Sequence, residues 1–127
     1  DAIQGLVDLA PTFLSACGID IPGRMQGVDQ LPVWTGQTER LRDNILIEHR
    51  HQAKSYTIRS LVNQRYKLTV YKDHEFGELF DLQEDPGERF NRWDDPEYQA
   101  IKMQLMHEML DAEMQREPTE RPRIAGA

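Results

Sequence analysis

The chain has 127 residues, 39% of them hydrophobic and 29% charged, a length and composition that suit a single folded domain. Its formal net charge is −7, and the basic residues are scattered among the acidic ones. This pattern argues against binding to a phosphate backbone, which requires clustered cations. No hydrophobic run approaches the roughly 20 residues that cross a bilayer, and a single cysteine excludes an internal disulfide. We therefore expect no nucleic-acid partner and no membrane span.

A short helix is predicted over residues 9–17, after a segment that is extended. Asp8 is a suitable N-cap because its carboxylate can accept hydrogen bonds from the first turn of a helix. Pro11 falls in that first turn, where a missing N–H costs little. Gly18 can adopt the left-handed conformation that ends many helices.

Residues 18–43 are predicted to form a long irregular connector, since glycine and proline recur and no hydrophobic period is sustained. Leu31, Val33 and Trp34 are its expected anchors. A connector of this length needs a surface on which to lie.

From residue 44 the hydrophobic period becomes two, which is typical of strands. Ile45 and Ile47 alternate with polar neighbours, and a fourth strand is predicted over residues 79–82. Asn63-Gln64 suits a two-residue hairpin, because Asn tolerates the positive φ of such turns. Short links favour antiparallel neighbours. The second and third strands are marked by Tyr56, Ile58 and Val62 and by Tyr66, Leu68 and Val70.

A final helix is predicted to begin at Asp94-Asp95-Pro96-Glu97, which combines an acidic cap with proline at the first position. Its hydrophobic stripe should cover one face of the sheet. The stripe consists of Tyr98, Ile101, Leu105, Met109 and Ala112.

The predicted fold class is therefore α+β. A four-stranded antiparallel sheet carries a C-terminal helix on one face and follows a short helix and a long irregular connector. We divide the chain into an N-terminal helix and connector (1–43), an α+β subdomain (44–117) and an irregular tail (118–127).

Three groups of residues occur in an order and spacing that resemble the C-terminal region of the type I sulfatases, in the alkaline-phosphatase-like superfamily. The groups are Val7–Thr12 with Gly18-Ile19, Met25–Val28 with Leu31-Pro32 and Gly36, and Arg65–Leu68 with Glu78–Leu82, Asp85-Pro86, Glu88 and Asn91. Asp29-Gln30 and Arg92 depart from the family pattern, which often has Ser-Leu and Leu at these places. In the intact family, residues 1–43 would correspond to the end of the catalytic domain.

The resemblance implies a hydrolase of sulfuric esters whose catalytic groups lie upstream. The family's nucleophile is a formylglycine made from the Cys or Ser of a Cys/Ser-x-Pro-x-Arg motif, and Asp and Asn residues hold a divalent ion, usually calcium. Cys17 lacks the Pro two residues on and the Arg four residues on, and we predict a buried structural cysteine. We expect neither a catalytic residue nor a metal ligand in this chain, which would brace the missing catalytic domain.

The one dense polar cluster is His49-Arg50-His51, after Glu48. On a strand the two histidines share a face and Arg50 points to the other. Two imidazoles are too few for a zinc site, whereas Arg50 could pair with an anionic substrate group. The cluster is our candidate for the rim of a substrate cleft, and the alternative is a solvated edge or a contact with a neighbouring domain.

Other titratable residues suit structural roles. His74 and His107 are predicted to be surface residues, and the pairs Glu84-Asp85 and Asp94-Asp95 to cap turns and helices.

Two other functions remain open. The chain could be an acidic α+β module that forms homo-oligomers through exposed hydrophobic residues. It could also be the tail of a related phosphonate or phosphate monoester hydrolase. The hydrophobic residues in question are Leu6, Phe13, Leu14 and Trp34.

Overall fold

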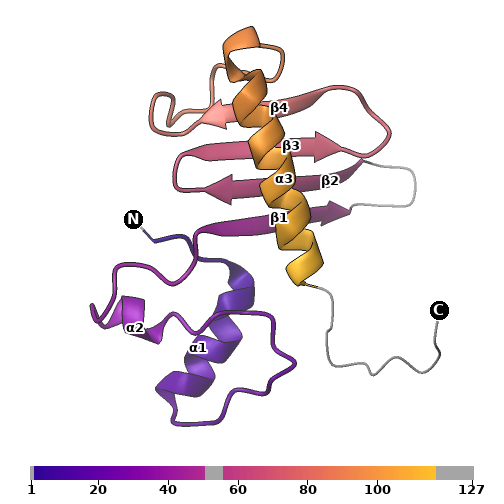
Figure 1. The fold of residues 1–127 in the computed structure, drawn as a ribbon. Coiled ribbons are helices and arrows are strands. Elements are labelled where there is room, and N and C mark those ends of the chain that lie inside the picture. Colours follow the sequence, from indigo (N-terminus) through magenta and orange to yellow (C-terminus); the bar gives the residue numbers. More distant parts are fainter. Residues whose placement is uncertain (1, 51–55, 117–127) are drawn as a thin grey trace, which may run out of the picture.

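A four-stranded antiparallel sheet crossed by one long helix forms the larger part of the computed structural model, which describes residues 2–50 and 56–116 (Figure 1). The strands follow one another in the order β1-β2-β3-β4, as the short links predicted. Their bounds are Asn44–Arg50 (β1), Thr57–Asn63 (β2), Tyr66–Tyr71 (β3) and Gly77–Asp81 (β4), and the helix α3 covers Gln99–Gln115. The predicted fold class is confirmed.

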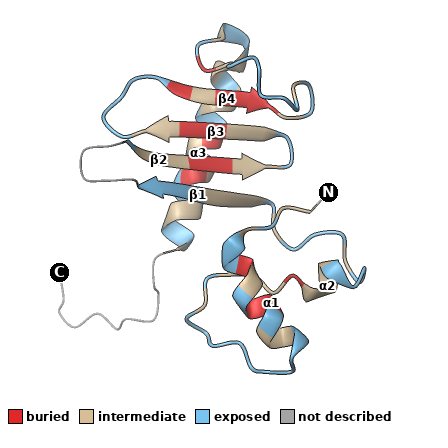
Figure 2. Ribbon diagram, turned by 180° about the vertical axis from the view of Figure 1, so that it is seen from behind, coloured by how far each residue is buried: buried red, intermediate tan, exposed pale blue. Residues whose placement is uncertain are grey.

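The core is a row of leucines covered by α3. Leu61, Leu68 and Leu79 oppose one another on three adjacent strands, and none of them is exposed. Leu105 and Met109 of α3 lie on this row. The predicted stripe of α3 faces the sheet with all its members, and Figure 2 shows the buried residues concentrated there.

The other face of the sheet has no helix over it in the described structure (Figure 2). Ile45, Ile47 and Ile58 lie on this open face, because residues paired across antiparallel strands share a face and alternate along each strand. Ser60 and Thr69 meet here through a 2.9 Å hydrogen bond between their hydroxyls. We refer to this side as the open face.

The hairpin between β2 and β3 differs from the prediction. Its two loop residues are Gln64 and Arg65, one position later than expected, and Asn63 does not have a positive φ. Instead the side-chain oxygen of Asn63 accepts hydrogen bonds from the N–H groups of Arg65 and Tyr66, at 3.0 and 2.7 Å. Asn63 therefore stabilises the turn through its side chain.

The N-terminal part lies beyond the β1 edge of the sheet (Figure 1) and contains three short helical segments. They are the 3₁₀ turn η1 (Leu6–Asp8), the helix α1 (Leu9–Ala16) and the helix α2 (Leu31–Trp34). The predicted helix is confirmed, including Pro11 in its first turn and Gly18 at a φ of 67°. The connector contains α2 and is otherwise irregular.

Asp8 is buried and occupies the predicted N-cap position of α1, but its carboxylate makes no capping hydrogen bond to that helix. Its carboxylate accepts hydrogen bonds from the N–H groups of Gly5 and Val28, at 2.9 and 2.8 Å, and pairs with Arg42 at 2.6 Å. The backbone oxygen of Asp8 accepts a hydrogen bond from Thr12. Asp8 thus joins η1, the connector and the segment leading into β1.

One other sequence prediction for this part was wrong. Cys17 is exposed rather than buried, because the C-terminal end of α1 projects away from the sheet (Figure 1). Of the expected anchors, Leu31 and Val33 are partly buried, and Trp34 is 45% exposed but donates a hydrogen bond to Gln4 at 2.9 Å. The connector is also held by Gln30, which is fully buried. Its backbone N–H donates to the hydroxyl of Thr12 at 2.8 Å.

The segment before α3 follows the predicted capping pattern. Asp95 is the N-cap of the 3₁₀ turn η2 (Pro96–Tyr98), and its carboxylate accepts a hydrogen bond from the N–H of Glu97 at 3.0 Å. Within the described residues, no helix has both the length and the hydrophobicity needed to cross a membrane. The predicted tail, residues 118–127, lies outside the described residues.

Gly77 at the start of β4 allows the Trp93 indole to pack directly on the strand. A Cβ atom at Gly77 would overlap the Trp93 ring. The indole N–H donates to the backbone oxygen of Glu75 at 3.2 Å, and the Lys102 ammonium lies 4.6 Å from the ring centre. The tryptophan therefore connects β4, the segment before α3 and α3 itself.

We predict that Gly77→Ala lowers the free energy of unfolding by about 1–3 kcal/mol, because a packed core cannot admit the extra methyl group without moving the indole. Urea unfolding monitored by tryptophan fluorescence measures the change. Gly87→Ala is the matched control, since its Cβ would meet only the flexible Arg89 side chain, at 3.3 Å. Equal stability of the two variants would contradict this role of Gly77.

Candidate functional site

The predicted cleft residues lie at the end of β1, at an edge of the sheet. His49 is paired with Ile58 and Arg50 with Thr57 on β2, and both side chains are exposed. The alternation of the strand puts His49 on the open face and Arg50 on the α3 side. His51, the third predicted residue, lies outside the described residues.

An ionic cluster adjoins Arg50 on the α3 side. Arg59 of β2 pairs with Glu48 at 3.0 Å and with Glu113 at 2.8 Å, and Arg116 pairs with the same two carboxylates at 2.9 and 3.3 Å. The hydrogen bond from Arg116 is the main reason that the pKa of Glu48 lies below its usual value, with further contributions from Arg59 and Arg50. The cluster fixes the end of α3 against β1 and β2.

The chemistry available at this end of β1 is recognition of a charged or polar ligand. Arg50 is an exposed guanidinium, which can bind a sulfate or carboxylate through two parallel hydrogen bonds. Among the described residues, no group of three or more His, Cys, Asp or Glu side chains is arranged to hold a metal ion. The described residues therefore do not fit the divalent ion of the sulfatase mechanism.

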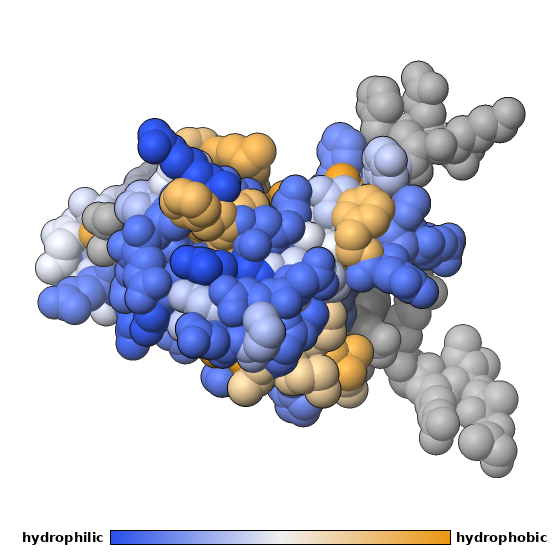
Figure 3. Space-filling view, turned by 90° about the horizontal axis from the view of Figure 1, so that it is seen from above, coloured by the Kyte–Doolittle hydropathy of each residue, from blue (hydrophilic) through white to orange (hydrophobic). Residues whose placement is uncertain are grey.

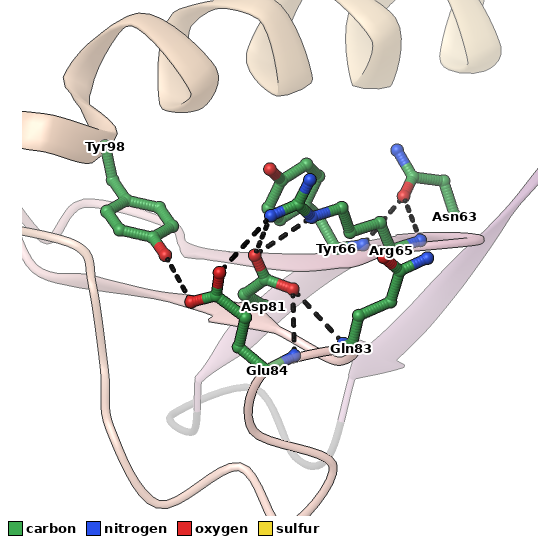
Figure 4. A network of polar contacts seen from close by, with 7 residues as sticks. All are labelled: Asn63, Arg65, Tyr66, Asp81, Gln83, Glu84 and Tyr98. Atoms are coloured by element: carbon green, nitrogen blue, oxygen red, sulfur yellow. Dashed lines mark hydrogen bonds and ion pairs between the residues drawn. The ribbon is translucent and has the colours of Figure 1, made fainter.

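A second polar network lies at the β4 side of the sheet, and no pattern in the sequence indicated it (Figure 4). The guanidinium of Arg65 donates to one carboxylate oxygen of Asp81 at 2.8 and 3.0 Å. The other oxygen of Asp81 accepts from the N–H groups of Gln83 and Glu84, at 3.1 and 3.3 Å. Glu84 in turn accepts from the Tyr98 hydroxyl at 3.2 Å. The network joins the β2–β3 hairpin, the end of β4 and the start of α3.

This network determines the charge of Asp81. Burial acts to raise the pKa of the Asp81 carboxyl, but the hydrogen bonds from Arg65 and from two backbone N–H groups outweigh it and hold the pKa below its usual value. Asp81 therefore stays ionised while almost fully buried. With both carboxylate oxygens already engaged inside the fold, it acts as a structural carboxylate.

The loop after β4 is held by its own side chains. One carboxylate oxygen of Asp85 accepts from the N–H groups of Arg89 and Phe90, at 2.6 and 2.8 Å. Asn91 accepts from the N–H of Leu79 and donates to the backbone oxygen of Gly77, both at 2.9 Å. These residues belong to the motif that carries the resemblance or adjoin it, and their roles are structural.

A cavity of about 510 Å³ lies between the N-terminal part, β1 and the end of α3. Arg24, Arg42 and Arg116 line it together with Ile45 and Leu46. His49 and Arg50 do not line it, so the predicted residues and this cavity are separate features.

Exposed hydrophobic residues gather on the N-terminal part. Leu6 is 88% exposed, and the rings of Phe13 and Trp34 lie edge to face at 6.1 Å while both remain about half exposed. Seen from the β4 side, by contrast, the surface is mostly hydrophilic with separate hydrophobic patches (Figure 3). We call Leu6, Phe13 and Trp34 the N-terminal hydrophobic surface.

The chain is similar to known proteins over most of its length. Residues 1–115 match the family described as N-sulphoglucosamine sulphohydrolase, C-terminal. The chain is 32% identical over 101 residues to a Delta 4,5-hexuronate-2-O-sulfatase of Bacteroides thetaiotaomicron, covering 77% of this chain and 21% of that protein.

Solved structures agree with this match. A 2-O GAG sulfatase is 30% identical with a TM-score of 0.73, over 86% of this chain and 24% of that one. A phosphonate monoester hydrolase from Silicibacter pomeroyi has a TM-score of 0.77 at 24% identity, over 91% of this chain and 26% of that one, and thus shares the fold. The chain spans about a fifth to a quarter of the length of these proteins.

We predict that Asp81→Asn lowers the free energy of unfolding by about 2 kcal/mol at neutral pH, because Arg65 loses its two short charged hydrogen bonds to Asp81 and keeps only the longer ion pair with Glu84, at 3.6 Å. Since the pKa of Asp81 is lowered in the folded state, its contribution is complete above the ordinary carboxyl pKa of about 4 and is lost as the pH falls through the folded-state value. Urea unfolding at a series of pH values should therefore show the difference from wild type shrinking below about pH 4.

The control for this experiment is Asp43→Asn, because the Asp43 side chain is 86% exposed and its ion pair with Arg40 is long, at 3.7 Å. It should change stability little at any pH. A stability difference for Asp81→Asn that stays constant down to pH values of about 2 would contradict the assignment.

Proposed function

The chain belongs to the N-sulphoglucosamine sulphohydrolase C-terminal family, and we therefore propose that it braces the catalytic region of a sulfatase and borders its substrate cleft. The observation that carries the proposal is the match over residues 1–115 to a C-terminal family. The two sulfatases compared above are several times its length, and we assign the catalytic activity to the rest of the protein.

The reaction we propose for the whole protein is hydrolysis of a sulfate ester carried by a sugar. The support is the similarity to a sulfatase of unsaturated hexuronates and to a 2-O GAG sulfatase. Formylglycine and a divalent cation such as calcium would supply the nucleophile and the Lewis acid, and we assign both to the catalytic region, outside residues 1–127. The described residues contain no ligand set that fits the cation, so we assign them support and substrate binding.

The bracing role rests on the two-part architecture. We propose that residues 44–117 form the subdomain and that residues 1–43 belong structurally to the end of the catalytic domain. The N-terminal hydrophobic surface supports this division, because half-exposed rings and an exposed leucine are the type of surface that a neighbouring domain covers. A chain separated from that domain would instead form oligomers through the same surface.

For the cleft we propose His49, Arg50 and His51. Arg50 carries the charge that a sulfate group requires, and His49 lies beside it on the same exposed strand end. The role that we assign to these residues is to bind and orient the substrate.

We predict that the full-length protein hydrolyses sulfate esters and that Arg50→Gln raises KM about tenfold with little change in kcat. The reason is that Arg50 would bind the substrate equally well in the ground state and in the transition state. Steady-state kinetics on a sulfated sugar measure both values. Arg89→Gln is the matched control, since Arg89 is an exposed arginine on the loop after β4. An unchanged KM for Arg50→Gln would contradict the assignment of Arg50 to the substrate cleft.

An assay with other esters distinguishes a sulfatase from the second candidate, a phosphonate or phosphate monoester hydrolase. Phosphonate and phosphate monoesters should be hydrolysed more slowly than the sulfate ester, and the 127-residue chain alone should hydrolyse none of the three. Faster turnover of a phosphonate monoester would favour the phosphonate hydrolase instead.

A further inference from the structure

Four aromatic rings gather at one end of the sheet, close to the strand end that carries His49. Tyr56 lies 5.8 Å from Tyr71 and 5.2 Å from His74, and Phe76 lies 4.9 Å from both Tyr71 and His74, all measured between ring centres. We call Tyr56, Tyr71, His74 and Phe76 the ring cluster. Its members come from the residue just before β2, the end of β3 and the β3–β4 loop.

The ring cluster is open to solvent. Tyr56 is 54% exposed, Phe76 is 51% exposed, and His74 is exposed as well. None of these rings belongs to the core beneath α3. The contacts between the rings nevertheless restrict their movement. Little conformational entropy would therefore be lost when a ligand stacks on them.

The register of the strands places Tyr71 of the ring cluster on the same face of the sheet as His49. His49 is paired with Ile58, and Ile58 with Tyr71, so these three side chains form one row on the open face. His49 and Tyr71 are two strands apart, which corresponds to about 10 Å.

The cluster combines ring faces with polar groups. The Tyr71 hydroxyl donates to the Glu78 carboxylate at 3.1 Å, and the Tyr56 hydroxyl and the His74 imidazole add further polar atoms. Ring faces with a few hydrogen-bonding groups at their edge are typical of small-ligand sites. The C–H groups of a sugar carry partial positive charge and suit the negative face of a ring, while its hydroxyls suit a carboxylate. The N-terminal hydrophobic surface has Leu6 and two apolar rings instead, which suits a protein neighbour.

We propose that the ring cluster binds a saccharide ring of the substrate by stacking, with Glu78 accepting hydrogen bonds from sugar hydroxyls. The inference rests on the proposed function, because it takes the ester to be carried by a sugar. It adds a sugar-recognition surface on the face of the sheet that carries His49, next to the strand end from which Arg50 points to the α3 side. These residues act in substrate binding and specificity.

Kinetics of the full-length protein test the inference through two substrates. Tyr56→Ala and Phe76→Ala should each raise KM for a sulfated disaccharide about fivefold to tenfold, while KM for 4-nitrophenyl sulfate, which carries no sugar, stays within about twofold of wild type. Phe90→Ala is the matched control, since Phe90 is 63% exposed on the loop after β4. Equal changes for both substrates, or none for either, would overturn the inference.

A binding measurement separates this inference from the proposed function. Aromatic NMR spectra of the 127-residue chain should shift at Tyr56 and Phe76, and not at Phe90, on addition of the 6-sulfate of N-acetylglucosamine or the 2-sulfate of a hexuronate. Sulfate-ester turnover by the full-length protein without such shifts contradicts the inference alone. Shifts without turnover contradict the proposed function alone.

Discussion

Leu61, Leu68 and Leu79 face α3 from three adjacent strands, and Leu105 and Met109 close over them. Burial of these side chains is the main favourable contribution to this part of the fold, at roughly 1.5–3 kcal/mol for each. The other stabilising contacts are arranged around the row. Trp93 packs on Gly77 at one side, and the ion pairs of Arg59 and Arg65 fix α3 and the β2–β3 hairpin.

The residues left outside this core form surfaces of different chemistry. The N-terminal part presents a hydrophobic surface beyond the β1 edge, whereas the far end of β1 presents Arg50 and His49. The ring cluster lies on the open face beside that end. This separation agrees with the proposed division of roles, in which one surface contacts the catalytic region and the other contacts the substrate.

Patterns within one element predicted most of the fold. The stripe of α3, the Asp95 cap and the alternation of the strands are all encoded by neighbouring residues. What the sequence did not reveal depends on residues distant in the chain. Asp8 fits the signature of a helix cap, but Val28 and Arg42 engage its carboxylate. Likewise the ring cluster combines the residue before β2, the end of β3 and a loop, so patterns within one element could suggest His49 and Arg50 but not the rings on the same face as His49.

The central claim is that the sheet and α3 form a self-supporting unit around the leucine row, to which the N-terminal part is attached by fewer contacts. Hydrogen exchange of backbone amides in the intact 127-residue chain tests it most directly. We expect the amides of Leu61, Leu68 and Leu105 to exchange only through global unfolding, and those of α1 to exchange through smaller local openings. Equal or greater protection of α1 would contradict this account of how the structure is held together.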